Sequence, residues 1–242
     1  MNLIIDIGNS LIKLAVFEHD ILIEKIVCQY QEYQREIKKI VNIYNNIENI
    51  IVSNVGNIEI NSFLDTISNT KITLIDRNNK FPFNNLYQSP ETLGIDRMIL
   101  AAGAVLKFPN KNRLVIDIGT CITYDYVDEQ NNYHGGAISP GIQLRYNSLN
   151  NYTAKLPLLE KMLPESIIGN STNNSIHSGI INGIVFEIDG FISSYLQDNE
   201  NFIIILTGGD AVFLAKRLKN TIFANSNFLL ESLNQTYQFN QK

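Results

Sequence analysis

A short motif occurs twice in this chain, and this repeat constrains the fold more than any other feature. Residues 3–9 read Leu-Ile-Ile-Asp-Ile-Gly-Asn, and residues 114–120 read Leu-Val-Ile-Asp-Ile-Gly-Thr. In each copy an apolar, β-branched run that is typical of a buried strand reaches an aspartate, and a glycine follows two residues later. Second strands are predicted at 11–17 and 122–127. Each copy therefore predicts a strand, a tight glycine turn and another strand, and the copies open two halves of similar length.

The rest of the chain alternates between helical and strand patterns, which predicts an α/β fold. The break between the halves is expected near residues 108–112, and it gives two predicted domains, 1–110 and 111–242. Helices are expected at 31–48, 59–69, 93–107, 173–196, 211–218 and within 226–238. Further strands are expected at 49–53, 71–75 and 202–206, with a loop at 76–92 and a loop-rich region at 135–141.

The helix predicted at 173–196 has isoleucines at every fourth position from Ile176 to Ile192. Such a stripe places the side chains on one face of the helix. That face fits either the core of the chain or a contact with a second copy, and the spacing does not separate the two.

Composition and charge exclude several classes of protein. The net charge is −5, and no basic stripe suggests a nucleic-acid partner. The two cysteines, Cys28 and Cys121, form no Cys-x-x-Cys motif, and the three histidines lack metal-ligand spacing. The N-terminus lacks the basic region of a signal peptide, and no apolar stretch reaches the length of about 18 residues that a membrane helix needs. We therefore expect a soluble cytoplasmic protein with no membrane or nucleic-acid partner.

The first glycine turn, which starts at Asp6, has the composition of a phosphate-binding turn. Gly8 would let backbone N–H groups approach a phosphate without a clashing Cβ atom. An aspartate at the end of a buried strand is costly unless it is paired or lies near a cation, and Asp6 could hold Mg²⁺ through water. Lys13 could reach a phosphate, although a lone strand lysine is more often solvated. The alternative is an ordinary hairpin turn whose aspartate bonds its own backbone.

The second turn, which starts at Asp117, and a third element strengthen the phosphate interpretation. The third element, residues 207–210, reads Thr-Gly-Gly-Asp and joins a predicted buried strand to a predicted helix. The glycine pair permits close backbone approach, and a helix N-terminus favours an anion or a polar edge. Any single Gly-Gly pair is more often an ordinary turn between a strand and a helix. Three such elements in this order are what a protein needs to hold a phosphate chain from both sides of a cleft.

In this order the three elements resemble the phosphate-1, phosphate-2 and adenosine motifs of the actin-like ATPase superfamily, which includes sugar kinases, acetate kinase and actin. This resemblance implies a fold class: α/β, with two duplicated ribonuclease-H-like domains and a nucleotide cleft between them.

Motifs in the middle of the chain resemble those of one family in that superfamily, the type III pantothenate kinases. Residues 94–97 read Gly-Ile-Asp-Arg and resemble the family's Gly-x-Asp-Arg signature, with Tyr87 just upstream. Residues 135–141 resemble its Gly-Gly-x-Ile-x-Pro-Gly loop. Further matching segments are 153–157, 169–172 and 178–179, so that the resemblance extends from residue 3 to about residue 233. The departures are Cys121 in place of the usual alanine, Ser10 in place of threonine, and the lack of a glycine in 231–233.

The resemblance implies an activity, cofactors and partners. The family transfers the γ-phosphoryl group of ATP to the primary hydroxyl of pantothenate and gives 4′-phosphopantothenate, in the first step of coenzyme A biosynthesis. It uses Mg²⁺ and a monovalent cation, K⁺ or NH₄⁺. A homodimer is also implied, to which the helix at 173–196 contributes, with pantothenate bound close to the partner subunit.

The resemblance also implies a role for each matching residue. Asp117 would sit at the monovalent-cation site, and Asp6 would hold Mg²⁺ through water. The residues expected to bind ATP are Asp6, Ile7, Gly8, Asn9, Ser10, Leu11, Ile12, Lys13 and Thr120. The residues expected to contact pantothenate are Tyr87, Gly94, Ile95, Asp96, Arg97 and Thr172. Without the resemblance, Tyr87 would be an ordinary loop aromatic residue and Thr172 a helix N-cap.

Asp96 is the candidate catalytic base. An aspartate has an ordinary pKa of about 3.9 and is a weak base at neutral pH. In a loose phosphoryl-transfer transition state the proton leaves late, so that a weak base in the right place suffices. Arg97 could keep Asp96 ionised or bind a substrate oxygen. From the residues alone, 94–97 would instead be the start of a helix with a local salt bridge.

Two other functions stay open at this point. Another small-molecule kinase of the superfamily would share the ATP motifs but would not need the segments 94–97 and 135–141. A nucleotide-binding regulator without turnover belongs to a different class, and the presence of Asp6, Asp96 and Asp117 argues against it.

Overall fold

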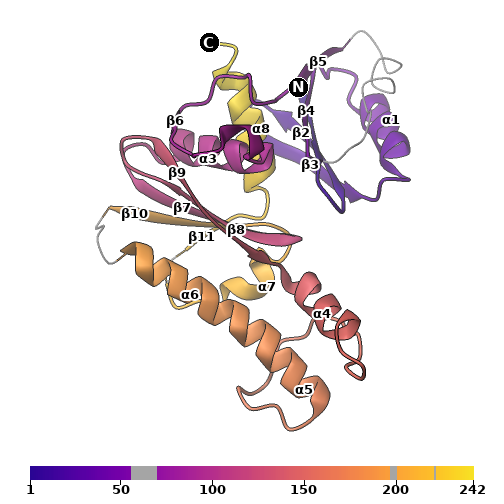
Figure 1. Cartoon of the computed structure of the whole chain (residues 1–242). Coiled ribbons are helices and arrows are strands. Elements are labelled where there is room, and N and C mark those ends of the chain that lie inside the picture. The colour runs from indigo at the N-terminus through magenta and orange to yellow at the C-terminus, as the bar shows by residue number, and fades with distance from the viewer. Residues whose placement is uncertain (56–69, 197–200, 221) are drawn as a thin grey trace. The chain divides into compact units, whose positions relative to one another are not determined.

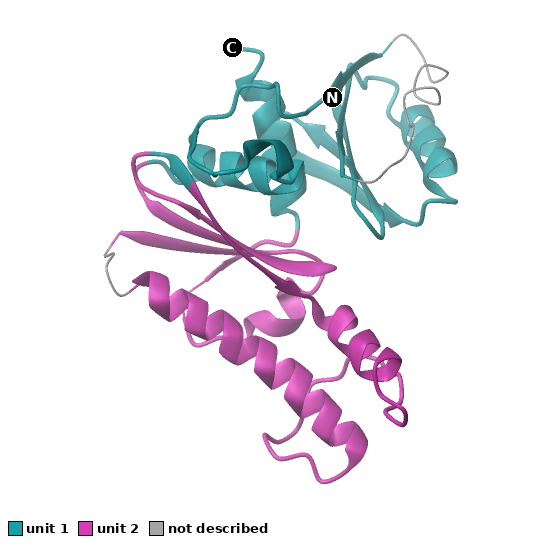
Figure 2. Cartoon of the chain, viewed as in Figure 1, with its two compact units in different colours: residues 1–109, 131–133, 227–242 teal, residues 110–130, 134–226 magenta. Residues whose placement is uncertain are grey.

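A computed structural model describes residues 1–55, 70–196, 201–220 and 222–242 of the chain (Figure 1). The helix predicted at 59–69 lies outside the described residues. The chain divides into two compact units (Figure 2). Unit 1 comprises residues 1–109, 131–133 and 227–242, and unit 2 comprises residues 110–130 and 134–226. The predicted domain boundary after residue 110 stays a prediction, since two later segments, residues 131–133 and 227–242, also belong to unit 1.

Unit 1 is built on a five-stranded sheet with the order β3-β2-β1-β4-β5. Its strands are β1 (Asn2–Ile7), β2 (Ile12–Glu18), β3 (Ile21–Cys28), β4 (Asn49–Asn54) and β5 (Lys71–Leu74). β2 pairs antiparallel with both β1 and β3, whereas β4 pairs parallel with β1 and with β5. The strand β3 was not predicted. Its side chains alternate between exposed and half-buried positions, so it lacks the continuous burial of β1.

Helices cover both faces of this sheet (Figure 1). α1 (Tyr33–Ile43) packs its buried Tyr33, Ile37 and Ile40 with the β1 side chains of one face, including Leu3 and Ile5. α3 (Ile95–Lys107) packs against α8 (Phe228–Phe239), and α8 packs against β1, β2 and β4. Between β5 and α3 lie the two-residue strand β6 (Asn84–Asn85) and the 3-10 turn η1 (Pro90–Thr92), so that most of the predicted loop at 76–92 is confirmed.

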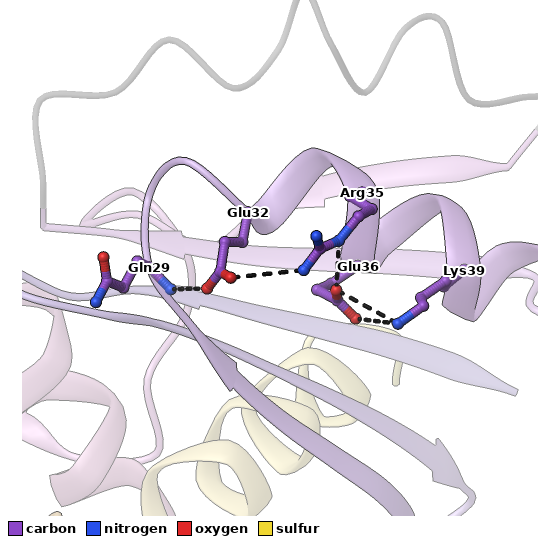
Figure 3. Close-up of polar contacts among 5 residues, drawn as sticks. All are labelled: Gln29, Glu32, Arg35, Glu36 and Lys39. Atoms are coloured by element: carbon purple, nitrogen blue, oxygen red, sulfur yellow. Dashed lines mark hydrogen bonds and ion pairs between the residues drawn. The ribbon is translucent and has the colours of Figure 1, made fainter.

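Polar side chains support the start and the surface of α1 (Figure 3). The Gln29 N–H donates to Glu32 Oε2 over 3.2 Å before the helix begins. One turn later Glu36 accepts from Arg35 Nε over 2.9 Å and from Lys39 Nζ over 3.2 Å. These hydrogen bonds from Arg35 and Lys39 lower the pKa of Glu36. The helix predicted at 31–48 is therefore confirmed in its centre and ends earlier, at residue 43.

Unit 2 repeats the strand arrangement of unit 1. Its strands are β7 (Asn112–Ile118), β8 (Cys121–Val127), β9 (Asn132–Pro140), β10 (Phe202–Thr207) and β11 (Phe223–Ala224), in the order β11-β10-β7-β8-β9. β7 pairs antiparallel with β8 and parallel with β10, just as β1 pairs with β2 and β4. The first residues of β9, Asn132 and Tyr133, are counted with unit 1 and pair with β6. The duplicated α/β fold that the repeat predicted is thus confirmed.

The loop-rich interpretation of residues 135–141 was wrong, because β9 continues to Pro140. Glycine and proline usually mark turns, but here the glycines permit a close approach between strands. A Cβ atom on Gly136 would lie 1.6 Å from the carbonyl oxygen of Tyr124 on β8. Only glycine fits at this point of the sheet.

The long helix predicted at 173–196 is confirmed as a continuous run of α5 (Thr172–His177), the π-helical turn η2 (Ser178–Asn182) and α6 (Gly183–Leu196). Its isoleucine stripe is buried in the core of unit 2, with exposed fractions of 0–6% from Ile176 to Ile192. The stripe is therefore a core face. The other helices of the unit are α4 (Ile142–Asn151) and α7 (Ala211–Ala215), which is shorter than the predicted 211–218.

None of the helices in the described part of the chain combines the length and the apolar character needed to cross a membrane.

Candidate active site

The first glycine turn joins β1 to β2 and holds Asp6 as a buried, paired carboxylate. The register of the sheet places Asp6 between Lys13 on β2 and Ser53 on β4. Ser53 Oγ donates to Asp6 Oδ1 over 2.9 Å, and Lys13 Nζ lies 3.4 Å from Oδ2. Asp6 is 2% exposed, so these partners offset a desolvation cost that an unpaired carboxylate would carry. Both partners of the Asp6 carboxylate, Ser53 and Lys13, are side chains, which does not support the alternative of an aspartate bonded to its own backbone.

The other residues of the first turn differ in what they can offer a ligand. The Gly8 N–H donates to the carbonyl oxygen of Leu11 over 3.1 Å, and the Tyr30 hydroxyl donates to the carbonyl oxygen of Gly8. Ile7 and Ile12 bury their side chains in the core, so that only their backbone groups could meet a nucleotide. Within the first turn, the predicted ATP-binding residues that expose their side chains are Asn9, Ser10 and Leu11.

The second glycine turn, residues 117–120 between β7 and β8, places Asp117 in the same position of its sheet. Asp117 lies in register between Thr123 on β8 and Thr207 on β10, as Asp6 lies between Lys13 and Ser53. The hydroxyl oxygens of Thr123 and Thr207 are buried and have no hydrogen-bond partner among the described residues. Buried hydroxyls of this kind call for a water molecule or an ion. Thr120, at the end of the turn, is exposed.

Gly208, from the third element, packs directly on the second turn. It has a φ of +99°, which favours glycine, and a Cβ atom there would lie 2.4 Å from both Asp117 Oδ1 and the carbonyl oxygen of Ile118. The Asp210 N–H also donates to the carbonyl oxygen of Ile118, over 3.1 Å. The side chain of Asp210 is paired with Lys161.

Gly141, at the end of β9, packs on the other side of the same turn. Its N–H donates to the carbonyl oxygen of Thr120 over 3.0 Å. A Cβ atom on Gly141 would lie 2.2 Å from the carbonyl oxygen of Gly119 and 2.5 Å from that of Thr120. Three segments that are far apart in the sequence therefore meet at the backbone of the second turn.

The candidate base Asp96 lies in the first turn of α3, half-buried, where the helix dipole favours a negative charge. Gly94 is the N-cap residue, and a Cβ atom there would lie 2.4 Å from Asp96 Oδ1. The Arg97 N–H donates to the same oxygen over 2.9 Å. The Asp96 carboxylate thus turns back over the start of the helix, in space that exists because Gly94 has no side chain. Ile95, between them, is buried.

Tyr87 and Arg97 are brought together in unit 1. Arg97 is 5% exposed, and its Cζ atom lies 5.6 Å from the centre of the Tyr87 ring, within the range of a cation–π interaction. The Tyr87 ring also contacts Tyr133, which is fully buried, with 6.1 Å between the ring centres. Tyr87 is therefore not an isolated loop residue.

Arg77 is a functional candidate that sequence reasoning missed. Its Nε and Nη2 atoms donate to the carbonyl oxygen of Leu93 over 3.0 Å and 2.8 Å. These bonds hold the backbone directly before Gly94 and Asp96. Arg77 stands alone in an Asn-rich loop, and no motif in the sequence marks it.

Thr172 lines a cavity of about 650 Å³ within unit 2. The interpretation of Thr172 as a helix N-cap was wrong, because the Ser171 hydroxyl accepts the Asn174 N–H over 3.2 Å and Thr172 is the first residue of α5. The wall of the cavity consists of Arg145, Ser148, Leu149, Leu156, Thr172, Ser175, Ile176, Gly179 and Ile180. Two of these, Gly179 and Ile180, belong to the π-helical turn, a feature that is frequent at functional sites.

The matching family model and the curated relatives agree on one family, and solved structures add similarities in fold. The model of the type III pantothenate kinase family matches residues 2–194. A type III pantothenate kinase from Flavobacterium johnsoniae is 58% identical over 239 residues, which are 99% of this chain and 98% of the relative. Among solved structures, a Campylobacter jejuni protein described as a Baf family transcriptional activator matches with a TM-score of 0.64 and 21% identity, over 99% of this chain and 98% of that one. The activator of 2-hydroxyisocaproyl-CoA dehydratase from Clostridium difficile, with bound ADPNP, matches with a TM-score of 0.56 and 11% identity, over 99% and 93%. These two structures are similar to this chain in fold.

Proposed function

The chain belongs to the type III pantothenate kinase family, and from this premise we propose how its residues phosphorylate pantothenate with ATP in coenzyme A biosynthesis. The observation that carries the proposal is the start of α3, where a half-buried carboxylate, a buried guanidinium and an aromatic ring lie together. Phosphoryl transfer needs positioning and charge neutralisation more than covalent help. The backbone N–H groups of the two glycine turns would position the phosphates, and cations would supply much of the charge neutralisation.

We assign Asp96 the role of the base that orients the attacking hydroxyl of pantothenate and accepts its proton. Its place in the first turn of α3 favours the ionised form that a base requires. Because Gly94 has no side chain, the space beside it is available to the carboxylate. Arg97 and Tyr87 would bind the acceptor, because a guanidinium and an aromatic ring suit the carboxylate and the apolar body of pantothenate. Arg77 would act through Leu93 as a positioning residue for this segment.

The environment of Asp6 fits a Mg²⁺ ion held through water, as the sequence predicted. Both of its oxygens already have a partner, Ser53 or Lys13, and the residue is almost fully buried, so that direct coordination would cost these contacts. Mg²⁺ usually keeps several of its waters and is bound together with the phosphates. When bound, the ion would neutralise charge on the phosphates, while Lys13 would be free to turn from Asp6 toward a phosphate oxygen.

The environment of Asp117 fits a monovalent cation. The buried hydroxyl oxygens of Thr123 and Thr207 flank Asp117 in register and lack partners among the described residues. Hard cations prefer oxygen ligands, and these two hydroxyls with one carboxylate offer such a set. Asp117, Thr123 and Thr207 would hold the ion, which supplies positive charge beside the nucleotide turn.

We further propose a cytoplasmic homodimer that binds neither nucleic acid nor membranes. The isoleucine stripe is buried in unit 2 and cannot serve as the dimer face. Unit 2 instead exposes apolar side chains between residues 138 and 186, and an exposed apolar patch is a common mark of an interface. Those that are at least half exposed are Ile138, Tyr152, Leu158, Met162, Ile167, Ile168 and Phe186. A molecular mass of about one chain by light scattering, at the concentration used for the kinase assay, would exclude the dimer.

The function is tested by measuring ADP release from ATP, Mg²⁺ and K⁺, with and without pantothenate. We expect pantothenate-dependent turnover in the wild type and its collapse in Asp96→Asn. Asp20→Asn is the control, because Asp20 accepts a hydrogen bond from Gln238 away from the predicted site. Turnover that does not depend on pantothenate would point to another acceptor and to another kinase of the superfamily. Tight ATP binding with no turnover on any acceptor would support the regulator instead.

A further inference from the structure

A polar cluster in unit 2 links the cavity wall to the second glycine turn; it consists of Tyr124, Ser139, Arg145 and Glu187. We propose that Glu187 is a positioning residue that holds Arg145 and the end of β9, and thereby fixes the second turn for nucleotide binding. The inference rests on the proposed role of that turn in binding ATP.

Glu187 lies on α6 and accepts hydrogen bonds from three other elements. The Tyr124 hydroxyl on β8 donates to its Oε1 over 2.8 Å, and the Ser139 hydroxyl on β9 donates to the same oxygen over 2.5 Å. The Arg145 Nη2 atom on α4 donates to its Oε2 over 2.6 Å. The side chains of Glu187 and Arg145 are only 23% and 20% exposed, so solvent screens this pair less than a surface salt bridge. One carboxylate therefore ties together a helix, two strands and a second helix.

The cluster reaches the second turn through a short chain of hydrogen bonds. Arg145 Nε donates to the carbonyl oxygen of Pro140 over 2.8 Å, and the backbone N–H of Arg145 donates to the carbonyl oxygen of Gly141 over 3.1 Å. Gly141 in turn donates to the carbonyl oxygen of Thr120 over 3.0 Å, with no room for a side chain between the two segments. Because Gly141 is packed against the turn, a shift of residues 139–141 must move the backbone of Thr120.

Arg145 also lines the cavity whose wall includes Thr172. The same guanidinium is held by Glu187 and by Pro140. The carboxylate of Glu187 thus orders the wall of the cavity lined by Thr172 and the predicted nucleotide turn together. Loss of the carboxylate should loosen both, whereas a purely structural role predicts lower stability alone.

Glu187→Gln tests the proposal with little change in size. The amide can still accept from one or two donors, but its NH₂ group then faces the donors of Arg145 or Ser139, and the charge is lost. Asp189→Asn is the matched control: Asp189 lies on the same helix, is buried and accepts the Lys219 N–H over 3.1 Å, and its carboxylate makes no hydrogen bond to β9 or α4 among the described residues. The readouts are the dissociation constant of ATP by isothermal titration, in Mg²⁺ and K⁺ without pantothenate, and the midpoint of thermal unfolding.

We expect Glu187→Gln to weaken ATP binding about tenfold, the effect of losing one charge-assisted hydrogen bond. Asp189→Asn should change ATP affinity by less than about twofold, within the range of a distant substitution, even though it also lowers the unfolding midpoint. The proposal is overturned if Glu187→Gln binds ATP as the wild type does, or if both variants weaken it equally. This titration measures ATP binding without pantothenate, so it does not depend on kinase activity. If the wild type binds ATP but does not phosphorylate pantothenate in the separate activity assay, the proposed function is refuted and the role of Glu187 in ATP binding can still be tested.

A double-mutant cycle adds a second, independent test. Arg145→Met removes the partner of Glu187, so that the double variant should bind ATP within about twofold of the weaker single variant. Fully additive losses would contradict a shared role for the two side chains. If Glu187→Gln does not fold, Ser139→Ala removes a single donor and should still weaken ATP binding about threefold, in line with one neutral hydrogen bond. An unchanged affinity in Ser139→Ala would then overturn the proposal.

Discussion

Replacing Gly208 with alanine should destabilise the chain and disturb the second glycine turn. Gly208 has a φ of +99°, and alanine at such an angle costs about 1 kcal/mol or more. The new Cβ atom would lie 2.4 Å from two oxygens, of which the carbonyl oxygen of Ile118 belongs to the backbone and cannot rotate away. Overpacking of this kind costs about 1–3 kcal/mol. Together the two effects give a loss of about 3 kcal/mol, with the Asp117 carboxylate displaced as well.

The neighbouring glycine provides the control for this prediction. A Cβ atom on Gly209 would meet nothing within 4 Å, and its φ lies outside the range that side chains avoid. Gly209→Ala should therefore change stability by about 0.5 kcal/mol or less. The two variants have the same composition and differ by one position in the same turn.

Thermal unfolding measured by circular dichroism is the assay for both variants. For a chain of this length 1 kcal/mol shifts the midpoint by about 2–4 °C, so that Gly208→Ala should unfold about 6–12 °C below the wild type. Gly209→Ala should stay within about 2 °C of the wild type. A Gly208→Ala variant that unfolds at the wild-type temperature would refute this prediction, because the protein would then have room for a side chain at residue 208.

Three further predictions concern the segment of the proposed base and the polar cluster around Glu187. Arg77→Met should raise the KM for pantothenate about tenfold in steady-state assays, with a smaller change in the KM for ATP, because the Leu93 carbonyl oxygen loses two charge-assisted donors; equal changes in both constants would contradict a local positioning role. Gly94→Ala should lower kcat about a hundredfold, because the new Cβ atom would lie 2.4 Å from Asp96 Oδ1 and would displace the carboxylate. Small misplacements of reacting groups have effects of that size. A variant with wild-type kcat would argue against Asp96 as the base. Burial opposes ionisation of Glu187, but the hydrogen bonds from its donors outweigh burial and lower its pKa. The stability that the carboxylate contributes should therefore be complete above the unfolded pKa of about 4.3 and be lost as the pH falls through and below that value. The difference in unfolding free energy between wild type and Glu187→Gln, measured from pH 7 downward, should shrink in that window.

The parts of the fold that could be predicted from the sequence are those whose signals are local. Residues 3–9 and 114–120 each contain the apolar run, the aspartate and the glycine that make a strand and a turn, and the structure contains both hairpins. β3 was missed because half of its side chains face solvent and two charged residues, Glu24 and Lys25, interrupt its apolar residues. β9 was misread because Gly136 is required by the carbonyl oxygen of Tyr124 on another strand, and the spacing of residues along the chain does not reveal that contact.

The candidate site follows the same division. Asp6 and Asp117 were found because each stands next to its own turn, whereas Arg77 and Glu187 act on groups 16 and 42–63 residues away in the sequence. No residue near Arg77 or Glu187 marks it as a partner of Leu93 or Tyr124. Pairs of this kind become visible only when the packing of the elements is known.

Asp96 stands between these cases. From its neighbours alone the segment 94–97 would be an ordinary helix start, and the resemblance to a kinase family suggested a base instead. The structure makes the two interpretations compatible, because Gly94 is the N-cap of α3 and also the residue whose missing side chain gives the Asp96 carboxylate its space. Serine, threonine, asparagine or aspartate would cap the helix better than glycine, by a few tenths of a kcal/mol. Glycine at the N-cap lowers the stability of the helix slightly, but any other side chain there would meet the Asp96 carboxylate. We expect this choice where the position of the carboxylate matters more than the stability of the helix.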